Sequence, residues 1–283
     1  MFSLVSADSG PSHPRSMKVF RVKPGSKIKL SDLDPDGEPE LAGDKETGLQ
    51  QLEVIRADIW KLQRMLFAER KHRLLVILQG LDGSGKDGTV RNVFGGIDPH
   101  GLRVISFKGP TAPELDRDYL WRIHREVPAR GEVVVFNRSH YEDLVAVNVK
   151  GLAPKAVWEK RYGHIAAFER LLLDEGTTLL KFFLHISRDE QRRRLQARLE
   201  NPDKHWKFHP DDIADSKRWP DFTEAYEDVI ERTGQEGAPW YIIPSNRKWY
   251  RNVAVATIVR DTLAKLELKF PPPAWDLKGV EIP

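Results

Sequence analysis

The sequence of 283 residues contains no cysteine. This absence excludes disulfide scaffolds, thiolate metal sites and thiol nucleophiles, and it fits a reducing compartment, so we predict a cytoplasmic protein. Long apolar runs are also lacking, since Leu74–Leu78, one of the longest, is far shorter than the ~20 residues of a membrane-spanning helix. Nor does an apolar segment follow Met1–Val5, as it does in a signal peptide. Any chemistry must therefore use oxygen and nitrogen groups.

A strong excess of charge of one sign is missing as well, because 45 Lys and Arg residues face 42 Asp and Glu residues. The total of +3 does not point to a nucleic-acid binder or to a protein of the membrane surface, although such a sum hides local fields. Hydrophobic residues make up 40% of the chain, and 20 glycines add to them. This composition is typical of a globular protein with a sizeable core.

Five short apolar runs are typical of buried parallel strands. They cover residues 74–78, 104–107, 133–136, 179–184 and 240–243. Apolar residues at helical spacing predict an amphipathic helix over 49–67, and further helices are expected over 86–95, 113–126, 155–174, 188–200, 216–232 and 248–268. Strands that alternate with helices predict one α/β domain, in which helices cover both faces of a parallel sheet.

Around this domain we expect extended segments. The predicted division is a flexible tail (1–16), an N-terminal arm and helix that pack on the core (17–70), the α/β domain (71–270) and a C-terminal tail (271–283). Met17 is an alternative start of the protein.

A glycine-rich segment, Gly80-Leu81-Asp82-Gly83-Ser84-Gly85-Lys86-Asp87-Gly88-Thr89, lies between the first strand and the helix that follows it. Gly80 and Gly85-Lys86 have the Walker A spacing, in which backbone N–H groups and a lysine surround the outer phosphates of a ligand. The positive N-terminus of the helix adds to this attraction. The segment predicts a phosphate-binding loop, and the alternative is a glycine-rich turn with a solvated lysine.

Two acids in this loop depart from the usual pattern. Asp87 occupies the position where most such loops carry the Ser or Thr that binds Mg²⁺, and Asp82 adds a second carboxylate. Because Mg²⁺ prefers oxygen ligands, we interpret Asp82 as a direct metal ligand. For Asp87 two interpretations stay open, a metal ligand or an acid that favours the first turn of the helix.

Polar residues also follow the third strand, in the order Asn137-Arg138-Ser139-His140-Tyr141-Glu142-Asp143. Ligands of open α/β sheets bind at the carboxyl ends of the strands, so this segment is expected beside the phosphate loop. Asp143 is a candidate second metal ligand, and the guanidinium of Arg138 is suited to neutralise a phosphoryl group in transfer. Ser139 and Glu142 have the spacing of a capping box, which is compatible with both roles.

Basic residues gather in three further segments. Arg122 lies four residues after Asp118, a spacing that favours an ion pair on the surface of a helix; the alternative for Arg122 is a contact with phosphate. Residues 188–209 carry seven Lys or Arg against four acids, and we interpret this segment as part of a basic lid over about 188–215, with a solvated helix as the alternative. In Arg247–Asn252, two interpretations of the aromatic residues stay open: they stack on nucleotide bases, or they pack in the core.

Together these strings resemble the polyphosphate kinase 2 family of P-loop phosphotransferases. The resemblance runs through Leu78–Gly88, Phe107–Thr111, Tyr119–His124, Phe136–Asp143, Lys204–Phe208, Asp221–Asp228 and Arg247–Asn252. It implies a P-loop kinase-like three-layer sandwich, in which a central parallel sheet is flanked by helices and covered by a helical lid. The arm and the lid resemble the one-domain branch, whose class III members phosphorylate AMP and ADP. Two residues depart from the family pattern, Arg117 where a histidine is usual and Asn148 where a basic residue is usual.

The resemblance also implies an activity, which is Mg²⁺-dependent, reversible transfer of the terminal phosphate of inorganic polyphosphate to AMP or ADP. Mn²⁺ is an alternative ion and guanine nucleotides are alternative acceptors. Catalysis is assigned to Asp82, Lys86, Arg138 and Asp143, and the metal to Asp82 and Asp143. The expected phosphate-binding residues are Gly83, Ser84, Gly85, Lys86, Asp87, Gly88, Thr89, Lys108, Arg122, Arg194, Lys204 and Lys207. The expected nucleotide-binding residues are Asn137, Arg138, Glu142 and Arg198.

Two other functions stay open at this point. The first is an ATP-dependent nucleotide or small-molecule kinase on the same scaffold, against which the acid at Asp87 argues. The second is a non-enzymatic binder of polyanions. For the enzyme we expect a homo-oligomer, dimer or tetramer, and neither a nucleic-acid nor a membrane partner.

Overall fold

The computed structural model describes residues 20–37, 43–208, 210–280 and 282. The expected tail over 1–16 and the alternative start at Met17 lie outside these residues, and so does the side chain of Lys207. Among the described residues, no helix is long and apolar enough to cross a membrane.

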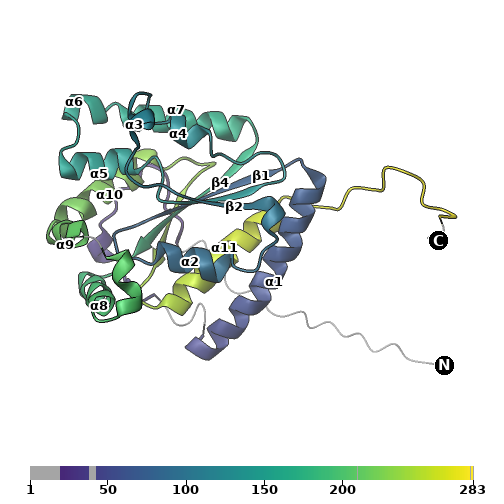
Figure 1. The fold of residues 1–283 in the computed structure, drawn as a ribbon, viewed down its shortest axis with the longest axis horizontal. Coiled ribbons are helices and arrows are strands. Elements are labelled where there is room, and N and C mark those ends of the chain that lie inside the picture. The colour runs from purple at the N-terminus through teal and green to yellow at the C-terminus, as the bar shows by residue number, and fades with distance from the viewer. Residues whose placement is uncertain (1–19, 38–42, 209, 281, 283) are drawn as a thin grey trace.

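The centre of the molecule is a sheet of five parallel strands in the order β2-β3-β1-β4-β5 (Figure 1). The strands are β1 (Arg73–Gln79), β2 (Leu102–Ser106), β3 (Val133–Asn137), β4 (Thr177–His185) and β5 (Trp240–Pro244). All five expected strands are therefore confirmed, and no end differs from the expected one by more than two residues. The phosphate loop leaves β1, the central strand, whose neighbour β3 carries the second polar segment at its end.

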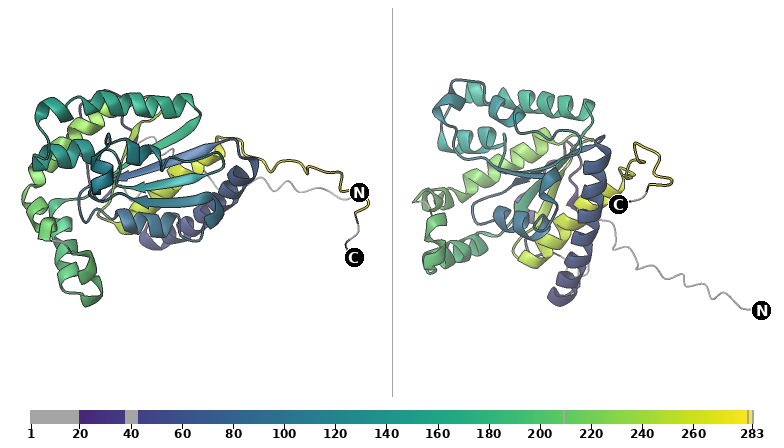
Figure 2. Two further views of the ribbon diagram at one scale, coloured as in Figure 1. Left: turned by 45° about the horizontal axis from the view of Figure 1, so that its top comes forward. Right: turned by 45° about the vertical axis from the view of Figure 1, so that its right-hand side comes forward.

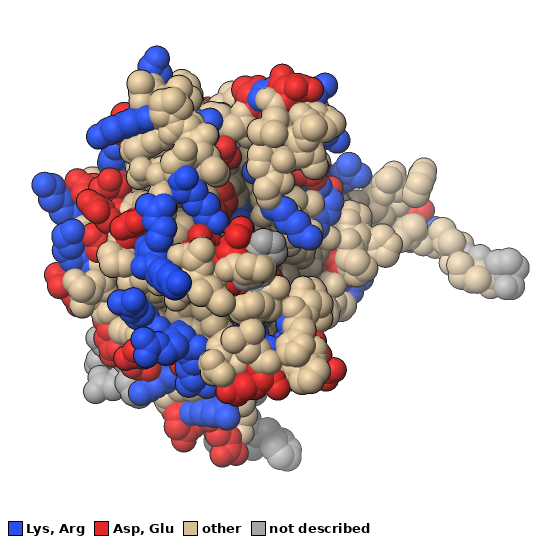
Figure 3. Space-filling model, turned by 60° about the vertical axis from the view of Figure 1, so that its left-hand side comes forward, with Lys and Arg blue, Asp and Glu red and all other residues tan. Residues whose placement is uncertain are grey.

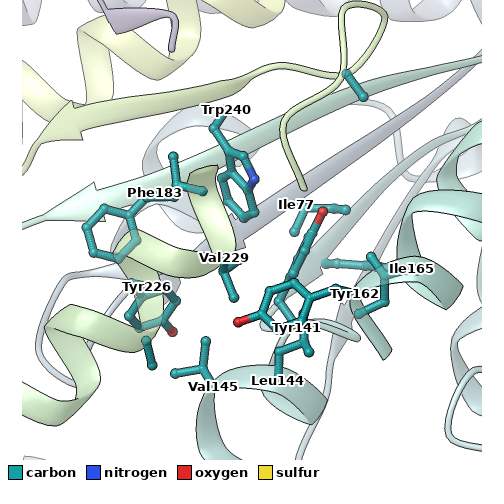
Figure 4. Close-up of a cluster of buried hydrophobic side chains, with 14 of the residues drawn as sticks. Ile77, Tyr141, Leu144, Val145, Tyr162, Ile165, Phe183, Tyr226, Val229 and Trp240 are labelled. Carbon is teal, nitrogen blue, oxygen red and sulfur yellow. The ribbon is translucent and has the colours of Figure 1, made fainter. Parts of the chain in front are cut away.

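Helices cover both faces of the sheet, as expected (Figures 1 and 2). One face is covered by α1 (Lys45–Glu69), α2 (Lys86–Val93) and α11 (Lys248–Ala264). The other face is covered by α5 (Glu142–Lys150), α7 (Arg161–Asp174) and α10 (Trp219–Thr233). Successive residues of a strand point to opposite faces, so Leu74 and Val76 join the first core while Leu75 and Ile77 join the second. Figure 4 shows the second core, in which Trp240 of β5 lies beside Tyr141 at the start of α5.

Several expected helices are shorter than predicted. The segment 113–126 forms α3 (Ala112–Leu115) and α4 (Trp121–His124), because Asp118 Oδ1 accepts from the backbone N–H of Leu120 at 3.0 Å and so forms a turn. The segment 155–174 is divided into α6 (Lys155–Trp158) and α7. Helix α10 begins at Trp219, with a proline in its first turn, and α9 (Pro210–Lys217) precedes it. Helix α5 was not among the expected helices, although the capping-box spacing of Ser139 and Glu142 pointed to a helix start there.

The described part of the N-terminal arm packs on this core. The Val22 N–H donates to the Trp240 carbonyl at 2.8 Å, at the edge of the sheet. Glu227 of α10 accepts from the Lys29 ammonium and from the Leu30 N–H, both at 2.8 Å. The predicted division of the chain into tail, arm, domain and second tail stays a prediction.

Candidate phosphate-transfer site

The loop between β1 and α2 depends on three glycines with positive φ. These angles are 143° at Gly80, 83° at Gly83 and 102° at Gly85, in a region that residues with a side chain rarely adopt. A Cβ atom at Gly80 would lie 2.8 Å from the Leu184 carbonyl oxygen. The loop can therefore fold in this way only with glycine at these positions, which is the physical reason for the spacing seen in the sequence.

Lys86, the first residue of α2, is buried at the loop. Only 7% of it is exposed, and its ammonium donates to the carbonyls of Gly80 at 2.6 Å and Leu81 at 3.2 Å. Burial, together with the nearby Arg138, lowers the pKa of Lys86 to about 8, although Asp82 and other carboxylates oppose this change. A solvated lysine is thus excluded, and the ammonium is held where the loop closes.

Arg138 lies beside the loop because β3 pairs with β1, and its N–H donates to the Leu78 carbonyl at 3.1 Å. Its φ of 63° turns the chain sharply at the end of the strand. The guanidinium donates to Asp82 Oδ1 at 2.6 Å. Burial acts to lower the pKa of Arg138, but the carboxylates of Glu142 and Asp82 outweigh it and raise that pKa. Burial likewise opposes the ionisation of Asp82, yet Lys86 and Arg138 lower its pKa, so that both partners are charged.

A small cavity of about 60 Å³ opens beside this ion pair. It is lined by residues of the loop, of α5, of the lid and of α10, namely Gly80, Leu81, Asp82, Arg138, Glu142, Ala146, Lys150, Gln191, Asp215, Phe222 and Tyr226. Lys150 of α5 pairs with Asp215 of α9 at 2.7 Å and so joins the two sides. Burial and the carboxylate of Glu142 raise the pKa of Tyr226, which keeps its hydroxyl protonated.

A second, larger cavity of about 470 Å³ lies on the other side of α5. Residues of α3, α4, α5, α6, α7 and the neighbouring segments line it, namely Pro110, Glu114, Leu115, Arg117, Asp118, Tyr119, Arg122, Asp143, Ala156, Val157, Lys160, Arg161 and His164. Asp143 Oδ1 accepts from Arg161 at 2.9 Å, and its Oδ2 lies 3.9 Å from Arg122 Nη2. Burial raises the pKa of Asp143, although Arg161 and Arg122 act against this change.

The two expected metal ligands therefore line different cavities, Asp82 the small one and Asp143 the large one. Asp143 takes arginines as its partners here, and the expectation that it holds one ion together with Asp82 stays a prediction. Within the described residues no group of three His, Asp or Glu side chains could hold a metal. Two carboxylates, Asp82 and Glu142, do share the small cavity. That number suits Mg²⁺, which proteins often bind by one or two carboxylates together with phosphate oxygens and water.

Arg122 also differs from the simpler expectation. It does not form the surface ion pair with Asp118, whose carboxylate instead caps the turn at Leu120. Its guanidinium is buried, donates to the Lys108 carbonyl at 2.8 Å and lies 3.9 Å from Glu114. The Lys108 side chain is exposed.

The segment predicted to be a lid consists of α8 (Arg188–Leu199), the short helix η5 (Pro202–Lys207) and α9, which lie together at one side of the molecule (Figure 2). Arg194 was expected to bind phosphate, but this needs correction because protein groups already occupy all its donors. Its Nε donates to Glu190, its Nη1 to the carbonyls of Gly83 and Ser84, and its Nη2 to those of Ser245 and Asn246. A guanidinium has five N–H donors, so none is left for a ligand.

Two other basic residues expected in the lid are more exposed to solvent than Arg194. Arg198 pairs with Asp212 of α9 at 3.3 Å and remains 25% exposed. Lys204 is exposed on η5. In Figure 3, Lys and Arg side chains gather on the face formed by the left-hand elements of Figure 1, interleaved with acids.

Four polar residues of the two motifs have local partners. Asp87 Oδ1 accepts from Asn137 Nδ2 at 2.7 Å, which ties the start of α2 to the end of β3. Thr89 is buried, and its hydroxyl donates to the carbonyl of Gly85 in the loop at 3.2 Å. The predicted capping box is not formed, because within this described stretch Tyr141 is the N-cap and Ser139 Oγ accepts from the Tyr141 N–H.

Sequence reasoning missed several residues that line the cavities. Lys150, Asp215, Gln191 and Tyr226 line the small cavity, and Arg161 lines the large one. One signal was available, because Glu142, Ala146 and Lys150 recur every four residues and so share one face of a helix. The others come from segments far apart in the chain, and no local pattern marks them.

Comparisons with known proteins agree with this geometry. The sequence model described as polyphosphate kinase 2 (PPK2) matches residues 42–271. The AMP/ADP-polyphosphate phosphotransferase of Meiothermus ruber is 53% identical over 91% of this chain and 96% of its own length. The ADP-polyphosphate phosphotransferase of Rhodopseudomonas palustris is 38% identical over 90% of this chain and 92% of its own length. The crystal structure of a polyphosphate kinase 2 from Arthrobacter aurescens superposes with a TM-score of 0.89 at 43% identity, covering 93% of this chain and 94% of that one.

Proposed function

The chain belongs to the polyphosphate kinase 2 family and is a polyphosphate phosphotransferase, and from this premise we propose that AMP and ADP are its acceptors and Mg²⁺ its metal. The observation that carries the proposal is the pairing of a charged phosphate loop with a separate cavity of nucleoside size. The reaction is reversible transfer of the terminal phosphoryl group of inorganic polyphosphate.

In this reaction an oxygen of the acceptor's terminal phosphate forms a bond to the last phosphorus of polyphosphate. The bond to the preceding bridging oxygen breaks, and the chain leaves one phosphate shorter. Negative charge spreads over the transferring oxygens in the transition state, where fixed cations stabilise it. Lys86 and Arg138 are such cations, since both are held in place by the contacts around the loop. The attacking oxygen is already deprotonated, so little general-base catalysis is needed.

The residues of the small cavity fit a metal ion that arrives with its phosphates. Asp82 would hold Mg²⁺, with Glu142 as a second carboxylate on the same cavity. The ion would supply neutralisation of phosphate charge, and Mn²⁺ is the alternative ion. Asp82 can serve because the neighbouring cations keep it ionised.

Cavity size separates the roles of the two sites. A volume of about 60 Å³ is too small for a nucleoside, whereas about 470 Å³ lies within the usual range of ligand pockets. The larger cavity combines apolar side chains, such as Leu115 and Val157, with the guanidinium groups of Arg122 and Arg161. We place the nucleoside of AMP or ADP there, with its phosphates extending past the start of α5 towards Arg138 and Glu142.

The proposal is tested by incubating the purified protein and Mg²⁺ with polyphosphate, or in a parallel series with ATP, as the donor and each of AMP, ADP, GMP and GDP as the acceptor. We expect phosphate transfer to the adenine nucleotides, with ADP and ATP as products. Transfer from ATP but not from polyphosphate would identify an ATP-dependent kinase. Salt-sensitive polyphosphate binding without any transfer would identify a polyanion binder. The predicted homo-oligomer and cytoplasmic location stay predictions.

A further inference from the structure

Arg251, near the start of α11, is a buried cation that the expected site does not include. Only 2% of the residue is exposed. Its guanidinium donates to Asn252 Oδ1 at 2.8 and 3.2 Å and to the Ser84 carbonyl at 3.2 Å. No carboxylate among the described residues forms an ion pair with it. A buried charge without a counter-charge is costly, and so it calls for an explanation.

The position of Arg251 is directly behind the phosphate loop. A Cβ atom at Gly85 would lie 1.8 Å from Arg251 Nη1, and one at Gly88 would lie 3.1 Å from Nη2. The guanidinium thus occupies the space that the missing side chains of Gly85, in the loop, and Gly88, in the first turn of α2, leave open. Burial and the neighbouring Arg194 lower the pKa of Arg251 to about 9.

Three side chains hold consecutive carbonyls of the loop. Gln191 donates to the Asp82 carbonyl at 2.8 Å, and Arg194 donates to that of Gly83 at 2.8 Å. The Ser84 carbonyl accepts from both Arg194 and Arg251. When successive carbonyls are fixed on one side of a loop, its N–H groups are available on the other, and such N–H groups form a concave anion site.

We propose that Arg251 is a positioning residue of the phosphate loop, which holds the Ser84 carbonyl away from the substrate and whose unpaired charge is balanced when phosphate occupies the loop. The inference rests on the proposed function, because it needs a polyanionic substrate. It differs from core packing in one respect. A packing residue stabilises the protein with and without ligand, whereas Arg251 costs stability without ligand and contributes to binding.

The test is Arg251→Met, which keeps most of the side-chain volume and removes the charge and the donors. The matched control is Arg260→Met on the same helix, where the guanidinium is partly exposed and bonded to Asp261. For each protein we would measure the Tm without ligand, the rise in Tm with polyphosphate and Mg²⁺, and kcat and KM for AMP.

For Arg251→Met we expect an unchanged or higher Tm without ligand, because replacement of a buried charge by an apolar side chain is often neutral or stabilising. The rise in Tm with polyphosphate should fall by half or more. The kcat should fall about tenfold with little change in KM for AMP, since a preorganised donor set acts mainly on the transition state. Arg260→Met should match the wild type in all these values.

A lower Tm without ligand, combined with a wild-type polyphosphate shift and kcat, would overturn the inference and leave a packing role. If Arg251→Met does not fold, Arg251→Lys takes its place, because it keeps the charge but loses the fixed fork. In Arg251→Lys, a reduced kcat together with a wild-type rise in Tm on addition of polyphosphate supports the positioning role. An unchanged kcat overturns that role. Failure of the proposed function shows separately, as wild-type protein that neither shifts with polyphosphate nor transfers phosphate.

Discussion

The two cavities on either side of α5 differ in size and in the state of their charges. In the small cavity, Arg138 Nη2 lies 2.6 Å from Asp82 Oδ1, and this pairing favours the charged form of both side chains. Lys86 lies beside the pair. In the large cavity, burial raises the pKa of Asp143, and apolar side chains share the lining with arginines. Fixed charges in a small space suit phosphate and a metal ion, whereas a mixed lining in a larger space suits a nucleoside. Glu142 and Asp143 are consecutive in the chain, yet they line different cavities.

The strongest test of this comparison removes the buried ammonium at the phosphate loop, next to the small cavity. Lys86→Met should lower kcat on the order of 10³-fold, because it removes a positioned charge from the transition state. Binding of AMP at the large cavity should change little, which equilibrium dialysis can measure. Lys61→Met on the exposed side of α1 is the control for loss of a lysine. Activity near that of the wild type in Lys86→Met would refute the assignment of the transfer site.

A pair of isosteric substitutions tests whether the two carboxylates have different roles. Asp82→Asn should lower kcat by about 10² and raise the Mg²⁺ concentration that gives half-maximal activity, because it removes the proposed metal ligand. Asp143→Asn should keep the wild-type Mg²⁺ requirement and raise KM for AMP by about tenfold, since it weakens the contacts with Arg161 and Arg122. Activity titrations with Mg²⁺ and AMP separate the two results. An equal shift in the Mg²⁺ requirement for both variants would instead support a metal site shared by Asp82 and Asp143.

The sequence allowed the small cavity to be predicted far better than the large one. Lys86, Asp82 and Arg138 lie in local strings whose spacing reflects the turn after a strand, and the register of β1 with β3 then brings them together. The opposite directions of Glu142 and Asp143 depend on how α5 is rotated against its neighbours. That rotation comes from packing against α10 and α7, which no local pattern records.

Arg194 is a second case in which the sequence did not predict the contacts of a side chain. Its place in a basic helix favoured a phosphate contact, but its donors reach carbonyls of the phosphate loop and of the segment after β5. The sequence shows how many basic side chains a segment carries. The direction in which each of them points depends on contacts with distant parts of the chain. For this reason the fold and the place of the loop in it were predicted correctly, whereas the contacts of Arg122 and Arg194 were not.

The pH dependence sharpens the contrast between the cavities, because the pKa of Lys86 is lowered from 10.5 to about 8 by burial and by Arg138. As the pH rises through about 8, the free enzyme loses this proton, and kcat/KM for polyphosphate should fall by about tenfold per pH unit. The fall of kcat itself should occur at higher pH than the fall of kcat/KM, since phosphate bound in the loop favours the ammonium form of Lys86. A kcat/KM that stays constant up to pH 9.5 would contradict a catalytic ammonium at this position.

Stability should move in the opposite direction to activity. Between about pH 8 and 10.5 the unfolded chain keeps the lysine proton that the folded protein has lost. The unfolded state therefore binds more protons, and the contribution of Lys86 to the free energy of unfolding rises with pH in this range. Denaturant unfolding of the wild type and of Lys86→Met at pH 8 and 10 measures the difference.

The smallest expected effect concerns the ion pair between Lys150 and Asp215, which joins α5 to the lid across the small cavity. The side chains are 30% and 20% exposed, so the pair contributes no more than about 1 kcal/mol. Lys150→Met and Asp215→Asn should each change kcat by about two- to threefold and leave KM for AMP unchanged, because the large cavity does not include them. The double variant should show no further change, since the first substitution already removes the contact. Additive effects on kcat would mean that each side chain acts separately on the substrate, and a change in KM for AMP would mean that the two cavities are not independent.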